Sequence, residues 1–442
     1  MSTYTKQPEL TVINTLAKSI ITSAYNSVTK RKRVYVAIDL GNGNVKVMTS
    51  EGVYVLQINF WAKADDKNLP LGDGFKQTGI VPASDDMFWG YEIKETEEKD
   101  EDLLNQGILL WGPGVVKADN PQKTKARKKR YEAINFRIMA KIILGTVVRL
   151  SEEKPNEPVE VYVNTGLPAS ERNNEDDVNA IRNAFKGDFT IDVHMPGGVI
   201  ETKKINCPIV IVNSQPRGSY NSVVYELKGE RATKFVFNGQ QMPPISSSNV
   251  LVCDGGFGTL DYDAFIKGNN TAADRHTSKN LGMSKAWTEV VQDIQDHHSY
   301  TVSIEEVERQ LRFSDKFVKG GLPEDHPTLG PSDVIDCTEY KERAFKRLAE
   351  KIIKDMADRY EEKLDEFAYI FVTGGVATPL FPYLYEVASQ PEFDIQNKLY
   401  LVPDAQMANA QGFLSELIAQ GPGIEGLLNQ KAEELKKKKK GK

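Results

Sequence analysis

A short turn near residue 40 combines a carboxylate, glycines, asparagines and a lysine, a set of groups that could bind a phosphate. Residues 34–40 place apolar side chains at alternate positions, as in a buried strand. Glycine then lets the backbone turn tightly with its N–H groups exposed to an anion. The turn lacks the Gly-Lys-Ser/Thr of a Walker A loop, and a plain hairpin uses similar residues, so both interpretations stay open here. The residues concerned are Asp39, Gly41, Asn42, Gly43, Asn44 and Lys46.

The same arrangement recurs at residues 249–265, which indicates a duplication. An apolar strand again ends in an aspartate, Asp254, and a glycine-rich turn leads to a second alternating strand. Two such units predict duplicated α/β domains that face each other, each offering exposed amides and one carboxylate to a single polyphosphate. Asp39 and Asp254 would bind Mg²⁺ through its waters, because this ion keeps much of its hydration shell. The structural alternative for Asp254 is an Asx-turn. The turn residues are Gly255, Gly256, Gly258 and Thr259.

A third turn follows the apolar stretch at residues 367–373. Gly374, Gly375 and Val376 come next, and the bare backbone of the glycines could lie against a flat base or a ribose. Residues 399–418 then enter a helix whose small side chains suit close packing between domains: Ala405, Ala408, Ala410 and Gly412.

The elements that must position these residues form a mixed α/β pattern. Residues 53–63 predict a strand that returns beside the first strand as a hairpin, and residues 87–114 predict a strand pair split by an acidic loop. An apolar helix is expected at residues 137–150. The segments 159–168 and 207–220 each predict a strand followed by a polar loop, and ligands of α/β sheets gather in such loops.

Composition excludes several classes of protein. The chain has 442 residues, enough for two or more domains, and its net charge of −6 argues against a nucleic-acid coat, so direct contact with DNA is not expected. Cys207, Cys253 and Cys337 are far apart and form no Cys-x-x-Cys pair, which predicts reduced thiols and a cytoplasmic location. No apolar run is long enough to span a bilayer, and no signal peptide is evident.

Both ends of the chain carry basic residues. Residues 1–33 predict an amphipathic helix that ends in Lys30–Arg33. It could pack on the body or a neighbouring subunit, with a membrane-surface helix or an organelle targeting segment as the alternatives. Lys436–Lys440 form a basic tail. A further basic stretch at residues 123–136 is interpreted as a solvated face, with a filament or DNA contact as the alternative.

In their order along the chain, these motifs resemble the superfamily of actin, the seventy-kilodalton heat-shock chaperones and the sugar kinases. The first two turns are similar to its two phosphate loops, and the third is similar to its adenosine motif. Two further segments resemble its connecting motifs. The Gly-Leu-Pro segment, the helix at 281–294 and the last motif look most like ParM-type bacterial actin-like proteins that segregate plasmids. The five motifs are DLGNGNVK, NTGLP, CDGGFGTLD, VTGGVA and ANAQGF.

The resemblance implies an actin-like (ribonuclease H-like) α/β fold with two duplicated domains around a nucleotide cleft. It divides the chain into an N-terminal helical extension, domain I, domain II, a C-terminal helix that returns to domain I, and a basic tail. These parts are expected at residues 1–33, 34–225, 226–404, 405–430 and 431–442.

The resemblance also implies roles for individual residues. Gln215 would orient the attacking water and, with Asp254, be catalytic, with a solvated loop amide as the alternative for Gln215. Lys46 would reach the β- and γ-phosphates, with a surface lysine on a strand as the alternative. Lys285 would flank the base, with a surface lysine as the alternative. The implied cofactors are ATP, or alternatively GTP, and Mg²⁺.

A filament-forming ATPase of the bacterial cytoskeleton or of plasmid segregation is the favoured function, with self-association and an adaptor protein that links the filament to DNA or other cargo. The alternative is a monomeric small-molecule kinase, which would need an acidic residue facing the γ-phosphate that the sequence does not offer clearly. A chaperone is disfavoured because only a short basic helix follows the last motif.

Overall fold

The structure is a computed structural model, and its contacts divide the chain into two units that are described separately. Unit 1 comprises Met1–Ile13 and Thr233–Ala408, and unit 2 comprises Asn14–Ala232 and Asn409–Lys442. The domain boundaries expected from the sequence stay a prediction. The structure describes residues 11–12, 31–41, 44–52, 54–64, 89–97, 99–112, 115, 120–123, 129–151, 157–195, 199–225, 235–237, 240–270, 277–312, 314–320 and 334–440.

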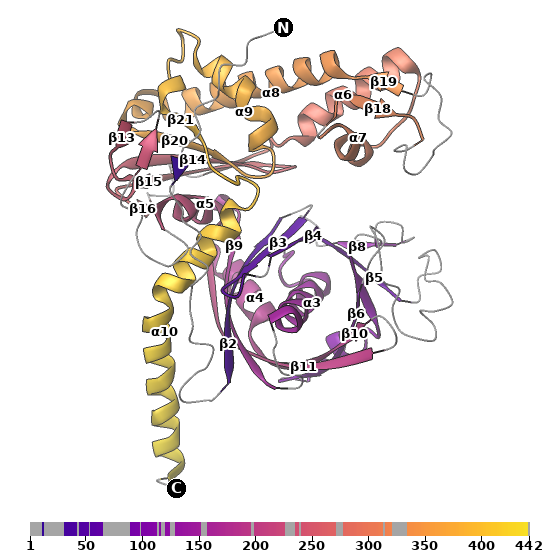
Figure 1. Ribbon diagram of the computed structural model, residues 1–442, viewed down its shortest axis with the longest axis vertical. Helices are drawn as coiled ribbons and strands as arrows, with labels where there is room; N and C mark the ends of the chain where they lie inside the picture. The colour runs from indigo at the N-terminus through magenta and orange to yellow at the C-terminus, as the bar shows by residue number, and fades with distance from the viewer. Residues whose placement is uncertain are drawn as a thin grey trace. The chain divides into compact units, whose positions relative to one another are not determined.

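Unit 2 is built on a ten-stranded sheet that curls around helix α3 (Ile134–Ser151) (Figure 1). Valines at alternate positions of two central strands, such as Val36 and Val163, pack on α3 in one core. This confirms the apolar helix predicted at residues 137–150. The strand order is β4 (Tyr54–Ile58), β3 (Asn44–Thr49), β2 (Lys32–Leu40), β9 (Val159–Leu167), β11 (Val199–Ser214), β10 (Gly187–Met195), β6 (Trp89–Thr96), β7 (Leu109–Trp111), β5 (Phe60–Lys63) and β8 (Gln122–Lys123).

In the described part of unit 2 the other α-helices are α2 (Glu101–Leu104), α4 (Glu175–Phe185), α5 (Gln215–Val224) and α10 (Ala408–Lys440). Helix α2 lies within the acidic run between β6 and β7, where a solvated loop was expected; Asp100 caps it by accepting a hydrogen bond from the Leu103 N–H. Helix α5 begins where the sequence predicted a polar loop.

Unit 1 contains a six-stranded sheet covered on one face by three helices. Trp287 of α6 (Ser284–His298), Phe345 of α8 (Thr338–Tyr360) and Leu380 of α9 (Ala377–Ala388) share one core with strand residues such as Leu251 and Ile370. The strands, in order, are β16 (Asn269–Asn270), β15 (Leu260–Ile266), β14 (Asn249–Gly255), β20 (Tyr369–Thr373) and β21 (Leu399–Leu401), and β17 (Thr277–Lys279) also pairs with β15.

Two small sheets complete unit 1. One consists of β1 (Thr11–Val12), β12 (Phe235–Phe237) and β13 (Gln240–Met242). The other pairs β18 (Lys316–Val318) with β19 (Val334–Asp336), next to α7 (Ile304–Leu311).

The two large sheets repeat one topology, which confirms the predicted duplication. In unit 2, β4-β3-β2 form an antiparallel meander, and β9 and then β11 continue parallel to β2. In unit 1, β16-β15-β14 form the same meander, and β20 and then β21 continue parallel to β14. Each Asp-Gly turn therefore joins the first two strands of a repeated sheet. The segment 53–63 pairs with β3 through β4, and not with the first strand as predicted.

The N-terminal segment differs from the expectation where the structure describes it. Thr11–Val12 form strand β1, and Lys32–Arg33 already belong to β2, so these four residues are not helical. The rest of the predicted N-terminal helix lies outside the described residues. At the other end, α10 continues through the Lys-rich segment to Lys440 and extends away from the rest of unit 2 (Figure 1). No helix in the described part of the chain is long and apolar enough to cross a membrane.

Lys141, on α3, is a buried cation within unit 2. Its side chain is 5% exposed, and its Nζ donates to the carbonyl oxygens of Phe185 and Lys186, both at 3.4 Å. The ammonium also lies 4.4 Å from the centroid of the Phe189 ring. Burial lowers the pKa of Lys141 to about 8, against an opposing effect of Cys207.

We expect Lys141→Met to raise the free energy of unfolding at pH 7 by about 1–3 kcal/mol, because methionine fills a similar volume without a charge. The unfolded chain binds this proton more tightly than the folded one. Wild-type stability should therefore rise between pH 8 and the ordinary lysine pKa of 10.5. Below pH 8 the folded protein bears the full cost of burying the Lys141 charge. Denaturant unfolding at several pH values measures this, with the exposed Lys204→Met as control. A Met variant with the wild-type pH dependence would contradict the prediction.

Candidate functional site

Asp39 lies near the carboxyl end of β2 and accepts hydrogen bonds from two side chains of unit 2, one on the adjacent strand and one at the start of α5. It is 1% exposed. Lys46 Nζ donates to Asp39 Oδ2 at 2.8 Å, and Gln215 Nε2 donates to Asp39 Oδ1 at 3.0 Å. The structure thus brings Gln215, which the sequence singled out separately, to the Asp39–Lys46 pair of the first turn.

The sheet explains why these side chains meet. Strands β2, β9 and β11 are parallel neighbours, so their carboxyl ends lie at one edge. Asp39 is the last residue but one of β2, and Gln215 is the first residue of α5, directly after β11. Lys46 is the register partner of Asp39 on the antiparallel strand β3, and partners directly opposite point to the same face.

The backbone around the first turn is fixed by side chains that sequence reasoning missed. Gly41 N–H donates to the Asn44 carbonyl at 3.0 Å, which closes the turn, and Asn59 Nδ2 donates to the Gly41 carbonyl at 2.8 Å. Thr165 Oγ1 donates to the Ile38 carbonyl, just before Asp39, at 2.7 Å. Asn59 follows a strand without any motif, and only the fold shows that it returns to the turn. The predicted site residues Asn42 and Gly43 lie outside the described residues.

Asp254 occupies the equivalent position in unit 1, at the end of β14, and is 6% exposed. The turn after it is closed by the Gly256 N–H, which donates to the Thr259 carbonyl at 2.8 Å. The start of α6 holds the same turn, since the Met283 N–H donates to the Gly256 carbonyl at 3.2 Å. Gly282 permits this approach, because a Cβ there would lie 2.4 Å from the Gly258 carbonyl carbon.

The third predicted turn lies directly against the second within unit 1. Gly374 has φ +92°, and a Cβ there would be 2.3 Å from the Gly255 oxygen and 2.4 Å from Asp254 Oδ1. Its N–H donates to the Ala405 carbonyl at 3.0 Å, and the Val376 N–H reaches the Gly255 carbonyl at 3.4 Å. Only glycine fits here, both for its backbone conformation and for the contact.

Space remains open beside other predicted residues. A Cβ added at Gly258 or Gly375 would meet no atom within 4 Å, so the backbone is accessible there. Lys285 is exposed on the first turn of α6. The structure thus brings Asp254, Gly255 and Gly374 together and leaves Lys285 on the surface.

A second carboxylate, which has no predicted role, lies on the same face of the unit 1 sheet as Asp254. Asp261 on β15 is the register partner of Asp254, so the two side chains share a face of the sheet, and Asp261 is 4% exposed. The corresponding partner of Asp39 is Lys46. The two repeated turns therefore carry opposite charges at matching positions.

The residues fit Mg²⁺ bound through water better than by direct coordination. Both oxygens of Asp39 already accept hydrogen bonds from Lys46 and Gln215, so a directly coordinated cation would compete with these donors for the carboxylate charge. Mg²⁺ keeps several waters and uses one or two carboxylates together with phosphate oxygens. Among the described residues no cluster of three or more His, Cys, Asp or Glu side chains could hold a metal.

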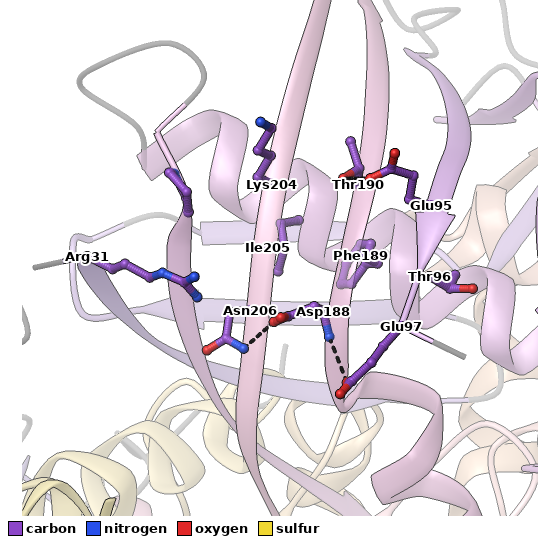
Figure 2. Close-up of a pocket in the computed structure, with 11 residues that line it drawn as sticks. Arg31, Glu95, Thr96, Glu97, Asp188, Phe189, Thr190, Lys204, Ile205 and Asn206 are labelled. Carbon is purple, nitrogen blue, oxygen red and sulfur yellow. Dashed lines mark hydrogen bonds between the residues drawn. The ribbon is translucent and has the colours of Figure 1, made fainter. Parts of the chain in front are cut away.

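A separate pocket of about 310 Å³ lies elsewhere on unit 2 (Figure 2). It opens at the amino end of β2, since Arg31 lines it, whereas Asp39 is at the carboxyl end of that strand. Within it Asn206 Nδ2 donates to Asp188, whose N–H donates to Glu97 at 3.3 Å. Acidic and basic side chains both line this pocket, which favours no class of ligand, and it contains none of the predicted residues.

The three cysteines agree with the expectation from their spacing. Cys207, Cys253 and Cys337 are buried free thiols. Burial raises the pKa of Cys207 and Cys337 to about 12, so neither is a reactive thiolate at neutral pH.

Two family models match the chain. Residues 37–218 match the model of the N-terminal domain of actin-like proteins, and residues 252–386 match that of the C-terminal part of the archaeal actin homologue MreB-like. The first includes Asp39 and Gln215, and the second includes Asp254 and Gly374. No curated protein sequence matches the chain.

Solved structures of actin-like proteins share the fold. The actin-like protein Alp7A matches with a TM-score of 0.65 at 13% identity, over 91% of this chain and 100% of its own. A ParM from Clostridium botulinum, solved as a 15-stranded filament, matches with 0.61 at 18% identity, over 88% and 99%. Bacillus thuringiensis ParM with AMPPNP matches with 0.58 at 14% identity, over 90% and 99%. These matches confirm the predicted fold.

Proposed function

We propose that this chain, which belongs to the actin-like superfamily, is a filament-forming ATPase that polymerises with ATP and disassembles after hydrolysis. The observation that carries the proposal is the contact of Gln215 and Lys46 with the buried carboxylate of Asp39. A plain hairpin turn would need neither contact.

The geometry at Gln215 suits a water-positioning role. Asp39 can only accept hydrogen bonds, so the amide nitrogen of Gln215 faces it and the amide oxygen is oriented by this contact. That oxygen can accept a hydrogen bond from a water and align the water's lone pair for attack. An amide is not a strong base, so Gln215 would orient the water, while stabilisation of the transferred phosphoryl group comes from charge and backbone amides.

The remaining predicted residues bind the nucleotide in this proposal. The turns after Asp39 and Asp254 offer backbone amides to the phosphates, and Lys46 adds a positive charge. Gly374, Gly375 and Val376 present backbone to the nucleoside. Mg²⁺, when bound, would neutralise phosphate charge, with Asp39 and Asp254 holding its waters. The similar fold of Bacillus thuringiensis ParM, which was solved with AMPPNP, supports nucleotide binding here.

Assembly into filaments is supported by the fold of a ParM that was solved as a filament. Hydrolysis would set the lifetime of the filament. Bound ATP favours the conformation that polymerises, because a ligand shifts a conformational equilibrium toward the state that it binds more tightly. Loss of the γ-phosphate removes that preference. We also propose that the filament segregates plasmids through an adaptor protein and that the protein is located in the cytoplasm.

Sedimentation with and without nucleotide tests the function. Pelleting that requires both ATP and Mg²⁺, together with release of phosphate, is expected. A protein that stays in the supernatant and releases ADP only when a sugar is added would instead be a kinase of the same superfamily. GTP in place of ATP, in the same assay, establishes the nucleotide preference.

A further inference from the structure

Helix α10 packs on the face of the unit 2 sheet that carries Asp39. Its contacts follow the outward-facing positions of β2 and β9: Phe413 meets Gly166, Glu416 meets Asn164, and Gly421 meets Tyr35. Beyond this point a Cβ at Gly423 or Gly426 would meet nothing within 4 Å, so the helix leaves the body there. The first three turns of α10 are thus the part that lies nearest the candidate site.

The ring of Phe413 fills the space between two glycines that flank Gln215. A Cβ at Gly166 would lie 2.4 Å from Phe413 Cζ and 3.4 Å from Gln215 Cγ. A Cβ at Gly218 would lie 2.8 Å from Phe413 Cε1. Gly218 is three residues after Gln215 in α5, so the two lie on one side of the first helical turn. The fully buried ring therefore supports the turn that presents Gln215.

Helix α5 and helix α10 are also in direct backbone contact. A Cβ at Gly412 would lie 1.7 Å from the Gly218 oxygen, and a Cβ at Gly218 would lie 2.7 Å from the Asn409 oxygen, so the contact needs glycine at both positions. Ser219 Oγ donates to Asn409 Oδ1 at 2.5 Å beside this contact. Any shift of α10 must consequently move the start of α5.

A network of buried polar side chains holds the backbone at Phe413 in place. Asn164 Nδ2 donates to the Phe413 carbonyl at 2.9 Å, and Asn213 Nδ2 donates to Glu416 Oε2 at 2.8 Å and to Asn164 Oδ1 at 3.0 Å. Burial raises the pKa of Glu416, against opposing effects of Arg217 and of the asparagines. Asn213 is two residues before Gln215, so strand, helix and candidate residue share one connected set of contacts.

We infer that Phe413 is a positioning residue for Gln215, and that the first turns of α10 set the orientation of the Gln215 amide. The inference rests on the proposed role of Gln215 in orienting water. Asp39 fixes the end of the Gln215 side chain, and Phe413 fixes the helical turn from which that side chain extends. Both contacts are needed to hold the Gln215 amide in one orientation, because the hydrogen bond to Asp39 can be kept while the α5 backbone moves.

The test is a double-mutant cycle with Gln215→Ala and Phe413→Leu, each alone and combined. Leucine keeps an apolar side chain but leaves part of the space between Gly166 and Gly218 empty. We expect Phe413→Leu to slow phosphate release about tenfold at saturating Mg-ATP, since small misplacements of reacting groups reduce rates strongly. Its affinity for Mg-ATP should stay within about twofold of wild type, and it should add nothing to the effect of Gln215→Ala.

A matched control separates positioning from stability. Phe185 is a fully buried aromatic residue in the core of the same unit, and Phe185→Leu should lower the melting temperature as Phe413→Leu does without slowing phosphate release. If Phe413→Leu slows the reaction equally in both backgrounds, or slows it no more than Phe185→Leu, the positioning role is overturned while that of Gln215 stands. If Gln215→Ala itself leaves phosphate release unchanged, the proposed role of Gln215 and this inference are both overturned.

Discussion

Replacing Gln215 with alanine is expected to slow phosphate release about a hundredfold and to leave the affinity for Mg-ATP close to that of wild type. The lost contact orients a water, which matters for the transition state and much less for the bound nucleotide. Asp39 keeps its ion pair with Lys46 at 2.8 Å in this variant, so the charge at the turn is preserved. Phosphate release at saturating Mg-ATP and nucleotide affinity, measured on the same preparations, check both parts of this prediction.

A control variant and the lifetime of the filaments provide two further comparisons. Gln106→Ala removes a half-buried glutamine of unit 2 whose Nε2 donates to the Asp102 carbonyl at 2.6 Å, and it should leave phosphate release unchanged. Filaments of Gln215→Ala should also persist longer after ATP is withdrawn. If they disassemble at the wild-type rate although hydrolysis is slowed, then hydrolysis does not time disassembly. Unchanged phosphate release would remove Gln215 from the site.

Local pattern was sufficient to predict the two Asp-Gly turns and their equivalence. Each turn joins two alternating strands that are neighbours in sequence, so the position of Asp39 or Asp254 at a strand end depends on short-range structure alone. The repeat of the turn then predicted duplicated α/β domains, and the two large sheets do repeat one topology.

Helix α5 could not be predicted in the same way. The segment after β11 is polar and contains glycine and proline, which are typical of a loop, yet proline is accepted in the first turn of a helix and the glycine is where α10 makes contact. Gly218 and Gly412 are far apart in sequence, so their contact is a property of the fold. The same holds for Gln215 and Asp39, which the motifs placed separately and only the parallel strands bring within 3.0 Å.

The carboxylates of Asp39 and Asp254 are expected to act through the cation, which gives their variants a distinctive dependence on Mg²⁺. Asp254→Asn and Asp39→Asn should each weaken the binding of Mg-ATP about 10- to 100-fold, as for groups that orient the ligands of a metal. In EDTA the same variants should bind ATP as well as wild type or better, because a negative charge near the phosphates has been removed. Asp254→Asn is the simpler of the two, because an amide at position 39 would turn a donor toward either Lys46 or Gln215, both of which donate to Asp39.

The matched control is Glu160→Gln, a buried carboxylate on the same sheet as Asp39 that is 3% exposed. Glu160 is the register partner of Arg33, six residues before Asp39 on β2, which places it about 20 Å from the candidate site. The ratio of the variant's ATP affinity to that of wild type should be the same in Mg²⁺ and in EDTA. Equal weakening of Asp254→Asn in Mg²⁺ and in EDTA would show that the carboxylate supports the turn and not the cation, and the proposed magnesium site would then be wrong.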